Sequence, residues 1–449
     1  MAAAARRPAS APSRHDGDGP HDRDDPHDRD DRRDRDHDVA SGGARGRRWA
    51  STMAGFAGAE PGPTAAIGGA PIRTAHADSC ARIDAGGLST GRDEGTRTAP
   101  SARTGTPGGR GARGRARRER EEQEDAELAP GATRASGAGR RAEPEEPDAW
   151  RTCFERDRDR ILHASAFRRL AGKTQVFVFP EDHQRTRLTH AIEVAQVAAG
   201  VARACRLNVA LTEAIALGHD CGHGPGGHAC EDALDPYLPE GFDHAPWGAA
   251  VSLRPLNLCA ETLDGIANHS WSRPAPATPE GEVVSWADRI AYVCHDWEDA
   301  VLAGIVTPSL LPDAVRERCG ERRGEQLGAF IDALVATTLE TGTVGMDHDM
   351  AQALATFRAC NYEHVYLREA SVAQAQAVVA VLRALVEHYA DRPNAIPAVR
   401  EGGGLAPGGP DAMRAAVTYV SGMTDRYAFR QAVAILGWDP AKLPKGVDA

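Results

Sequence analysis

The sequence predicts an all-α domain that follows a long low-complexity tail. Apolar residues recur at helical spacing beyond Trp150, and alternating apolar-polar stretches are nearly absent there. Breaks rich in proline and glycine at 236–248, 273–281 and 401–410 separate the helical stretches. Together these observations favour many helices joined by irregular connections over a sheet.

The tail is defined by its composition. Leucine, isoleucine, valine and phenylalanine occur seven times in residues 1–148, far below the roughly 20% under which a chain is expected to be disordered. Residues 15–38 are a tract of Asp, Arg and His, and residues 101–141 are rich in Gly, Arg and Ala. We therefore expect 1–148 to be a disordered tail and 149–449 to form one folded domain.

The elements beyond Trp150 follow from local signals. Asn208 stands directly before an apolar run, as an N-cap residue does. The segment 175–179 (QVFVF) is the only candidate strand, and it is short. Two apolar stripes predict helices: Leu188, Ile192, Ala195 and Ala199, and Val372, Ala375, Val379, Leu382 and Val386.

Charge and cysteine content exclude several classes of protein. The tail holds 26 acidic and 25 basic residues, whereas 149–449 carries a net charge of −10, which argues against nucleic-acid binding through a broad basic face. A local arginine or metal cluster could still bind a small polyanion. No run of 18 apolar residues exists, and Met1–Arg14 has no apolar core of a secretory signal, so no membrane partner is expected. Nine irregularly spaced cysteines indicate reduced thiols in a cytoplasmic protein.

Histidines gather between residues 183 and 295, most densely in GHDCGHGPGGH at 218–228. His219 and Asp220 come at the end of the helix predicted after Asn208, where a glycine-rich turn lets adjacent side chains converge on one target. We expect His269 and His295, which lie further along the chain, to be packing or surface residues.

Two more residues complete a plausible set of metal ligands. His190 lies in the predicted helix upstream, and Asp288 lies in another predicted helix downstream. Two imidazoles and two carboxylates suit a divalent ion such as Mg²⁺, Mn²⁺, Fe²⁺, Co²⁺ or Zn²⁺, with positions left for water and substrate. Such an ion lowers the pKa of bound water or neutralises phosphate charge.

Spacing adds further candidates around this set. Arg187 precedes His190 by one helical turn, which places a guanidinium suited to phosphate beside the expected metal. Tyr292 and Asp296 follow Asp288 at intervals of four residues, on one stripe of one helix. His228 and Glu231 are three residues apart, so the carboxylate is expected to orient the imidazole as an acid or base.

Several longer stretches resemble the bacterial deoxyguanosinetriphosphate triphosphohydrolase-like family of HD-domain phosphohydrolases. They are RDRDRILHASAFRRL (156–170), GKTQVF (172–177), RTRLTH (185–190), IALGHD (215–220), GHACEDAL (227–234) and GMTDRYA (422–428). The resemblance covers roughly 150–430. It implies an all-α HD fold with a helical C-terminal extension, a divalent metal, and hydrolysis of a deoxynucleoside triphosphate to deoxynucleoside and inorganic triphosphate.

The resemblance also assigns roles to residues. It implies metal ligation by His190, His219, Asp220 and Asp288, and catalysis by His228 with Glu231, assisted by His223 and His244. It implies substrate contacts by Arg187, Tyr292, Asp296 and Gln175. Assembly as a homo-oligomer is a further implication.

The chain departs from the family pattern in two loops. The loop after the His-Asp pair has Cys221, Gly224 and Gly226 where the family has Leu, Pro and Phe, and 245–247 (APW) replaces a polar run after His244. Two other functions therefore stay open: an HD phosphohydrolase acting on another nucleotide, and a catalytically weak protein that binds nucleotides or single strands.

Overall fold

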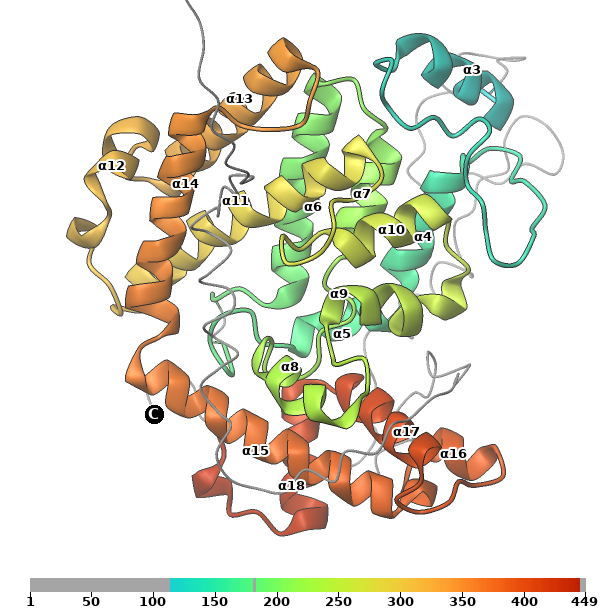
Figure 1. Ribbon diagram of the computed structural model, residues 1–449, viewed down its shortest axis with the longest axis vertical. Coiled ribbons are helices and arrows are strands. Elements are labelled where there is room, and N and C mark those ends of the chain that lie inside the picture. The colour runs from blue at the N-terminus through green and yellow to red at the C-terminus, as the bar shows by residue number, and fades with distance from the viewer. Residues whose placement is uncertain (1–113, 181–182, 445–449) are drawn as a thin grey trace, which may run out of the picture. The chain divides into compact units, whose positions relative to one another are not determined.

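The computed structural model describes residues 114–180 and 183–444. Its described residues are helical, with two isolated bridges (Arg141 with Cys259, Thr174 with Thr186) and no strand, which confirms the all-α prediction. Figure 1 shows their arrangement. The helices are α3 (Arg117–Glu127), α4 (Cys153–His163), α5 (Ser165–Arg169), α6 (Arg187–Ala204), α7 (Val209–Gly218), α8 (Ala229–Leu234), α9 (His244–Trp247), α10 (Ala260–Asn268), α11 (Pro279–Leu302), α12 (Asp313–Cys319), α13 (Arg323–Thr341), α14 (His348–Asn361), α15 (Glu369–Asp391), α16 (Pro397–Glu401), α17 (Pro410–Ser421) and α18 (Asp425–Leu436).

Apolar side chains form two hydrophobic cores. The first core lies among α4, α6, α7, α10, α11, α13 and α14, and the second among α8, α15, α17 and α18. Between Cys221, in the first core, and Ala229, in the second, the chain runs through the glycine-rich loop 222–228. This loop, which carries two histidines, is therefore held between the cores.

Two local predictions need correction. Residues 175–179 form bends and no strand; the only bridge beside this segment within the described residues is the isolated one between Thr174 and Thr186. In α6, Ile192 is 50% exposed, whereas Ala195 and Ala199 of the predicted stripe are buried and Leu188 packs against the first core. The predicted N-cap is confirmed: the side chain of Asn208 accepts a hydrogen bond from the amide of Leu211.

The folded region begins before the predicted residue 149. Residues 114–148 contain α3 and pack on the domain, with Ala132 and Ala135 buried in the first core. Thr133 donates hydrogen bonds from its amide (3.0 Å) and hydroxyl (2.7 Å) to Glu280 at the start of α11. The predicted disorder of residues 1–113 lies outside the described residues.

Two observations concern the predictions of reduced cysteines and of no membrane-spanning helix. The eight cysteines in the part of the chain that the structure describes form no disulfide. By length and composition, α15 could cross a membrane: its most apolar 18-residue window has a mean hydropathy of 1.3, and 28% of it is buried. One such helix is weak evidence, since core helices meet the same criteria, and Val381, Leu382 and Leu385 of α15 belong to the second core.

Candidate metal centre and active site

Helix α6 places Arg187 and His190 on the same buried face. Thr186 caps the helix by accepting from the amide of Thr189, while the hydroxyl of Thr189 accepts from the amide of Thr186. The helix therefore starts at Arg187, and His190 follows one turn later. Both side chains are buried.

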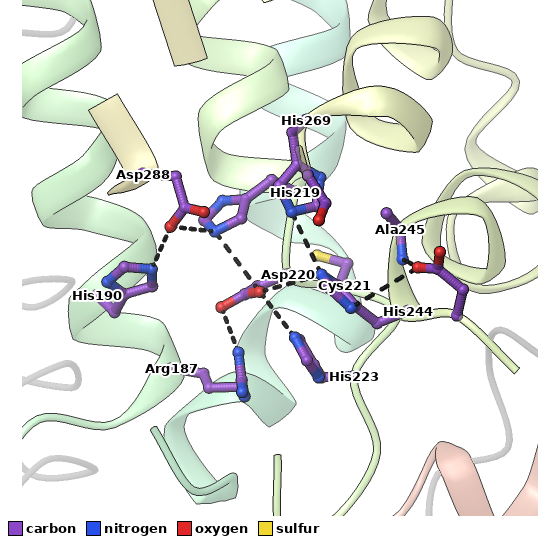
Figure 2. A network of polar contacts seen from close by, with 12 residues as sticks. Arg187, His190, His219, Asp220, Cys221, His223, His244, Ala245, His269 and Asp288 are labelled. Carbon is purple, nitrogen blue, oxygen red and sulfur yellow. Dashed lines mark hydrogen bonds and ion pairs between the residues drawn. The ribbon is translucent and has the colours of Figure 1, made fainter. Parts of the chain in front are cut away.

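Helix α7 ends so that His219 and Asp220 point toward α6 (Figure 2). The ring of His219 donates from Nδ1 to the carbonyl of Ala216 at 2.6 Å, which leaves a lone pair on Nε2. This Nε2 is buried and has no hydrogen-bond partner among the described residues. A buried acceptor without a donor is what a metal ligand shows before it binds its ion.

The four predicted metal ligands converge (Figure 2). Asp288 of α11 has its Oδ1 3.0 Å from His190 Nε2 and 3.7 Å from His219 Nε2. His219 Nε2 is 3.5 Å from Oδ1 of Asp220. Neighbouring ligands about 2.1 Å from one ion stand about 3 Å apart, so His190, His219 and Asp288 form a group that could hold a divalent cation, with Asp220 beside His219.

Electrostatics favour a cation here. Burial opposes ionisation of Asp220, yet the Arg187 guanidinium and nearby imidazoles hold the pKa of that carboxyl well below its usual range. Burial likewise opposes ionisation of Asp288, but the hydrogen bond from His190 lowers the pKa of its carboxyl. Both carboxylates are therefore charged at neutral pH.

Arg187 is held by one contact and keeps spare donors. Its Nη1 donates to Oδ2 of Asp220 at 2.8 Å. Its Nε and Nη2 are buried and have no hydrogen-bond partner within the described part of the chain. A guanidinium with two unused donors beside a metal site suits a phosphate group.

A second group of histidines flanks Asp220. His223 Nε2 lies 3.2 Å from Asp220 Oδ1, and the ring of His223 stacks on that of His244 at 3.7 Å. The predicted orientation of His228 by Glu231 is wrong: Glu231 instead accepts from Nδ1 (2.6 Å) and the amide (3.0 Å) of His244. The His228 ring is exposed, 5.0 Å from the His223 ring and 6.0 Å from that of His244.

His269 belongs to the same cluster, although the sequence analysis expected a packing or surface residue. Its Nδ1 donates to the carbonyl of Ile266 at 2.8 Å, and its Nε2 is 3.3 Å from His244 Nε2. Its ring lies 4.9 Å from that of His219. Both His219 and His269 directly follow a helix and bind the carbonyl three residues earlier, which is a signal that the sequence carried.

The predicted substrate contacts on α11 form a polar network next to His190 and Asp288. The hydroxyl of Tyr292 accepts from Nε of Arg358 at 3.0 Å, and Asp296 accepts from the hydroxyl of Tyr366 at 2.5 Å. Burial raises the pKa of Asp296 to about 7, against the hydrogen bond from Tyr366. Gln175 is not brought into the histidine cluster by any hydrogen bond of the structure, and its Oε1 is buried with no partner among the described residues.

Two family profiles match the chain. The HD domain matches residues 187–293, which hold all four candidate metal ligands. The phosphohydrolase-associated domain matches residues 344–433, from α14 to α18. The first match covers α6 to α11, and the second contributes most of the second core.

Curated relatives agree with these profiles. A deoxyguanosinetriphosphate triphosphohydrolase-like protein of Caldanaerobacter subterraneus subsp. tengcongensis is 41% identical over 296 residues, covering 64% of this chain and 86% of that protein. Proteins of the same description from Clostridium perfringens (strain 13 / Type A) and Ruegeria sp. (strain TM1040) are 39% and 36% identical. These matches cover 63% and 65% of this chain and 86% and 94% of those proteins, respectively. The chain therefore belongs to the deoxyguanosinetriphosphate triphosphohydrolase-like family of HD-domain phosphohydrolases.

Proposed function

We propose that the protein hydrolyses a deoxynucleoside triphosphate, with a divalent metal, to a deoxynucleoside and inorganic triphosphate. The single observation that carries the proposal is the buried, unpartnered His219 Nε2, which faces two carboxylates beside an arginine with unused donors. Family membership supports the reaction class.

The candidate metal ligands and Arg187 would have different roles in this reaction. A cation held by His190, His219, Asp220 and Asp288 would supply positive charge at the phosphate and a water of lowered pKa. Arg187 neutralises charge that develops on phosphate oxygens, which is the main requirement of phosphoryl transfer.

The leaving C5′ oxygen of the nucleoside needs a proton. Burial opposes protonation of His244, but the carboxylate of Glu231 raises the pKa of that imidazole overall. We therefore assign protonation of the leaving oxygen to His244, paired with Glu231. Exposed His228 is the alternative proton donor. In a double-mutant comparison, Glu231→Gln should add little to His244→Asn if the pair acts as a unit. If the effect of Glu231→Gln is instead additive with that of His244→Asn and non-additive with that of His228→Asn, His228 is the proton donor.

Product analysis tests the reaction. The full chain, stripped of metal, is assayed with each dNTP and GTP in Mg²⁺, Mn²⁺, Fe²⁺, Co²⁺ and Zn²⁺, and the products are separated by anion exchange. Intact triphosphate is expected; orthophosphate or pyrophosphate would indicate another HD phosphohydrolase, and nucleotide binding without turnover would indicate a binding protein. His219→Ala and Asp220→Ala should abolish both turnover and metal binding, whereas exposed His348→Ala should change neither. Unchanged turnover in His219→Ala and Asp220→Ala would refute the assignment of these residues as metal ligands.

The departure at 245–247 does not remove His244 from the site. Asp243 caps α9 by accepting from the amide of Ala245, and Trp247 is buried against Phe242 with ring centroids 5.0 Å apart. This packing supports a working active site over a weak binding protein. Cytoplasmic location and homo-oligomeric assembly remain part of the proposal, and light scattering of the full chain tests the assembly.

A further inference from the structure

Two sequence motifs resemble the family but have no role in the proposed chemistry: GKTQVF at 172–177 and GMTDRYA at 422–428. The structure joins them at one buried carboxylate. Asp425, 2% exposed, accepts from the amide (2.9 Å) and hydroxyl (2.5 Å) of Thr174 through Oδ2, and from the amide of Gly226 at 2.9 Å through Oδ1. One side chain of the phosphohydrolase-associated region thus binds the loop that follows the His-Asp pair.

A buried lysine makes the complementary contacts. Lys173, 3% exposed, donates from Nζ to the carbonyl of His223 and, at 3.1 Å, to the carbonyl of Ser421. It therefore links the main chain at the start of the histidine loop to the end of α17. Its own carbonyl accepts from the amide of Arg187 at 3.3 Å, which ties the same segment to the start of α6.

The loop has little room to move from this position. Gly226 has φ +76°, and a Cβ there would lie 2.4 Å from Val378 of α15. Gly227 has φ +64°, and a Cβ there would lie 2.9 Å from Nη2 of Arg187 and 3.2 Å from the carbonyl of Thr174. Only glycine fits these two positions, so the C-terminal elements and Arg187 together set the path of the loop.

We propose that Asp425 and Lys173 are positioning residues that fix the loop 222–228 and thereby hold His223 against Asp220 and His228 beside His223. The inference rests on the proposed function for its catalytic consequence, but the positioning itself is independent of which nucleotide is hydrolysed. Asp425 and Lys173 touch no reacting atom; they act through the main chain of the loop.

Asp425→Asn tests the proposal with little change in volume. The carboxylate accepts three hydrogen bonds through two oxygens, whereas an amide has one oxygen and would turn an NH₂ group toward a donor. We expect amide hydrogen exchange to accelerate about tenfold in 222–228 and not in the core of α6 or α7. We expect kcat to fall about 100-fold, as for a misplacement near 1 Å, with KM and bound Mn²⁺ nearly unchanged. Exposed Asp439→Asn is the matched control and should change none of these quantities.

A second pair of variants keeps the test valid if Asp425→Asn fails to fold. Thr174→Val removes the hydroxyl donor at similar size, and Thr174→Ser restores it. Accelerated exchange at 222–228 with Val and recovery with Ser supports the proposal. Exchange that stays at the wild-type rate with Val, or that rises throughout the chain with loss of Mn²⁺, overturns it. A wild-type chain without any hydrolysis would refute the proposed function alone, because the exchange measurements still decide the positioning.

Discussion

A buried ion pair ties the residues before 149 to the folded domain. Arg141 and Asp157 meet at 2.7 Å with side chains 6% and 0% exposed. Asp157 also accepts from the amide of Cys259 and the hydroxyl of Thr262, both at 2.8 Å, and Nη2 of Arg141 donates to the carbonyl of Cys153 at 3.0 Å. Arg141→Ala would leave the buried carboxyl group of Asp157 without its cation.

Removing one partner of a buried ion pair costs about 3–5 kcal/mol. For a domain of this size that loss lowers Tm by roughly 5–8 °C. Urea unfolding followed by circular dichroism measures the free energy of unfolding directly. Arg140→Ala is the matched control: this neighbouring side chain is exposed, so its loss should change the free energy by less than about 0.5 kcal/mol.

A double variant separates the two possible causes of the stability loss in Arg141→Ala, which are the unpaired charge and the lost packing of the arginine side chain. Adding Asp157→Asn to Arg141→Ala removes the unpaired charge, and should recover part of the lost stability because an amide can still accept one hydrogen bond. Equal stability of Arg141→Ala and Arg140→Ala would refute the structural role of residues 114–148. No recovery in the double variant would refute the buried charge as the cause.

Three further predictions concern the domain and its site. The pKa of Asp296 is about 7 in the fold and 3.8 as a reference, so its carboxyl stabilises the fold fully below pH 3.8 and loses that contribution as pH rises through 7. The contribution of Asp296 to the free energy of unfolding should fall by on the order of 4 kcal/mol between pH 4 and 8, so Asp296→Asn should lose less stability than wild type over this range in urea titrations; parallel slopes would contradict it. Gly226→Ala should destabilise the fold by about 1–3 kcal/mol in the same assay, through its positive φ and the contact with Val378, and an unchanged midpoint would argue against that strain. His269→Gln should weaken Mn²⁺ affinity about tenfold in calorimetric titration, because His269 packs on His219; wild-type affinity would remove it from the site.

The sequence anticipated which candidate metal ligands come together better than it anticipated their surroundings. His190, His219 and Asp288 lie close together, as the adjacent His-Asp pair and the resemblance to the family implied. The partner of Glu231 does not, because α9 brings the amide and Nδ1 of His244 to one carboxylate, 13 residues away in sequence. Local spacing favours His228 as the partner of Glu231, but in the fold the carboxylate of Glu231 contacts His244 instead.

The boundary of the fold was equally hard to predict from composition. A count of large aliphatic residues overlooks the buried alanines 132 and 135 and the pairing of Arg141 with a residue in α4. The candidate strand at 175–179 failed for a related reason. No described segment pairs with it beyond the isolated bridge between Thr174 and Thr186, and such pairing is not visible in local alternation.

The contact between Asp425 and Thr174 has a consequence for synthesis of the protein. The two residues are 251 positions apart, so Asp425 cannot fasten the loop at Gly226 until residue 425 has been translated. At 5–20 residues per second, roughly 13–50 s separate translation of Thr174 from that of Asp425. From the translation of Asp288 until that of Asp425, the nascent chain carries all four candidate metal ligands yet lacks the contact that fastens the loop. A premature stop shortly before residue 425 would therefore leave a polypeptide that holds metal ligands but lacks this fastening.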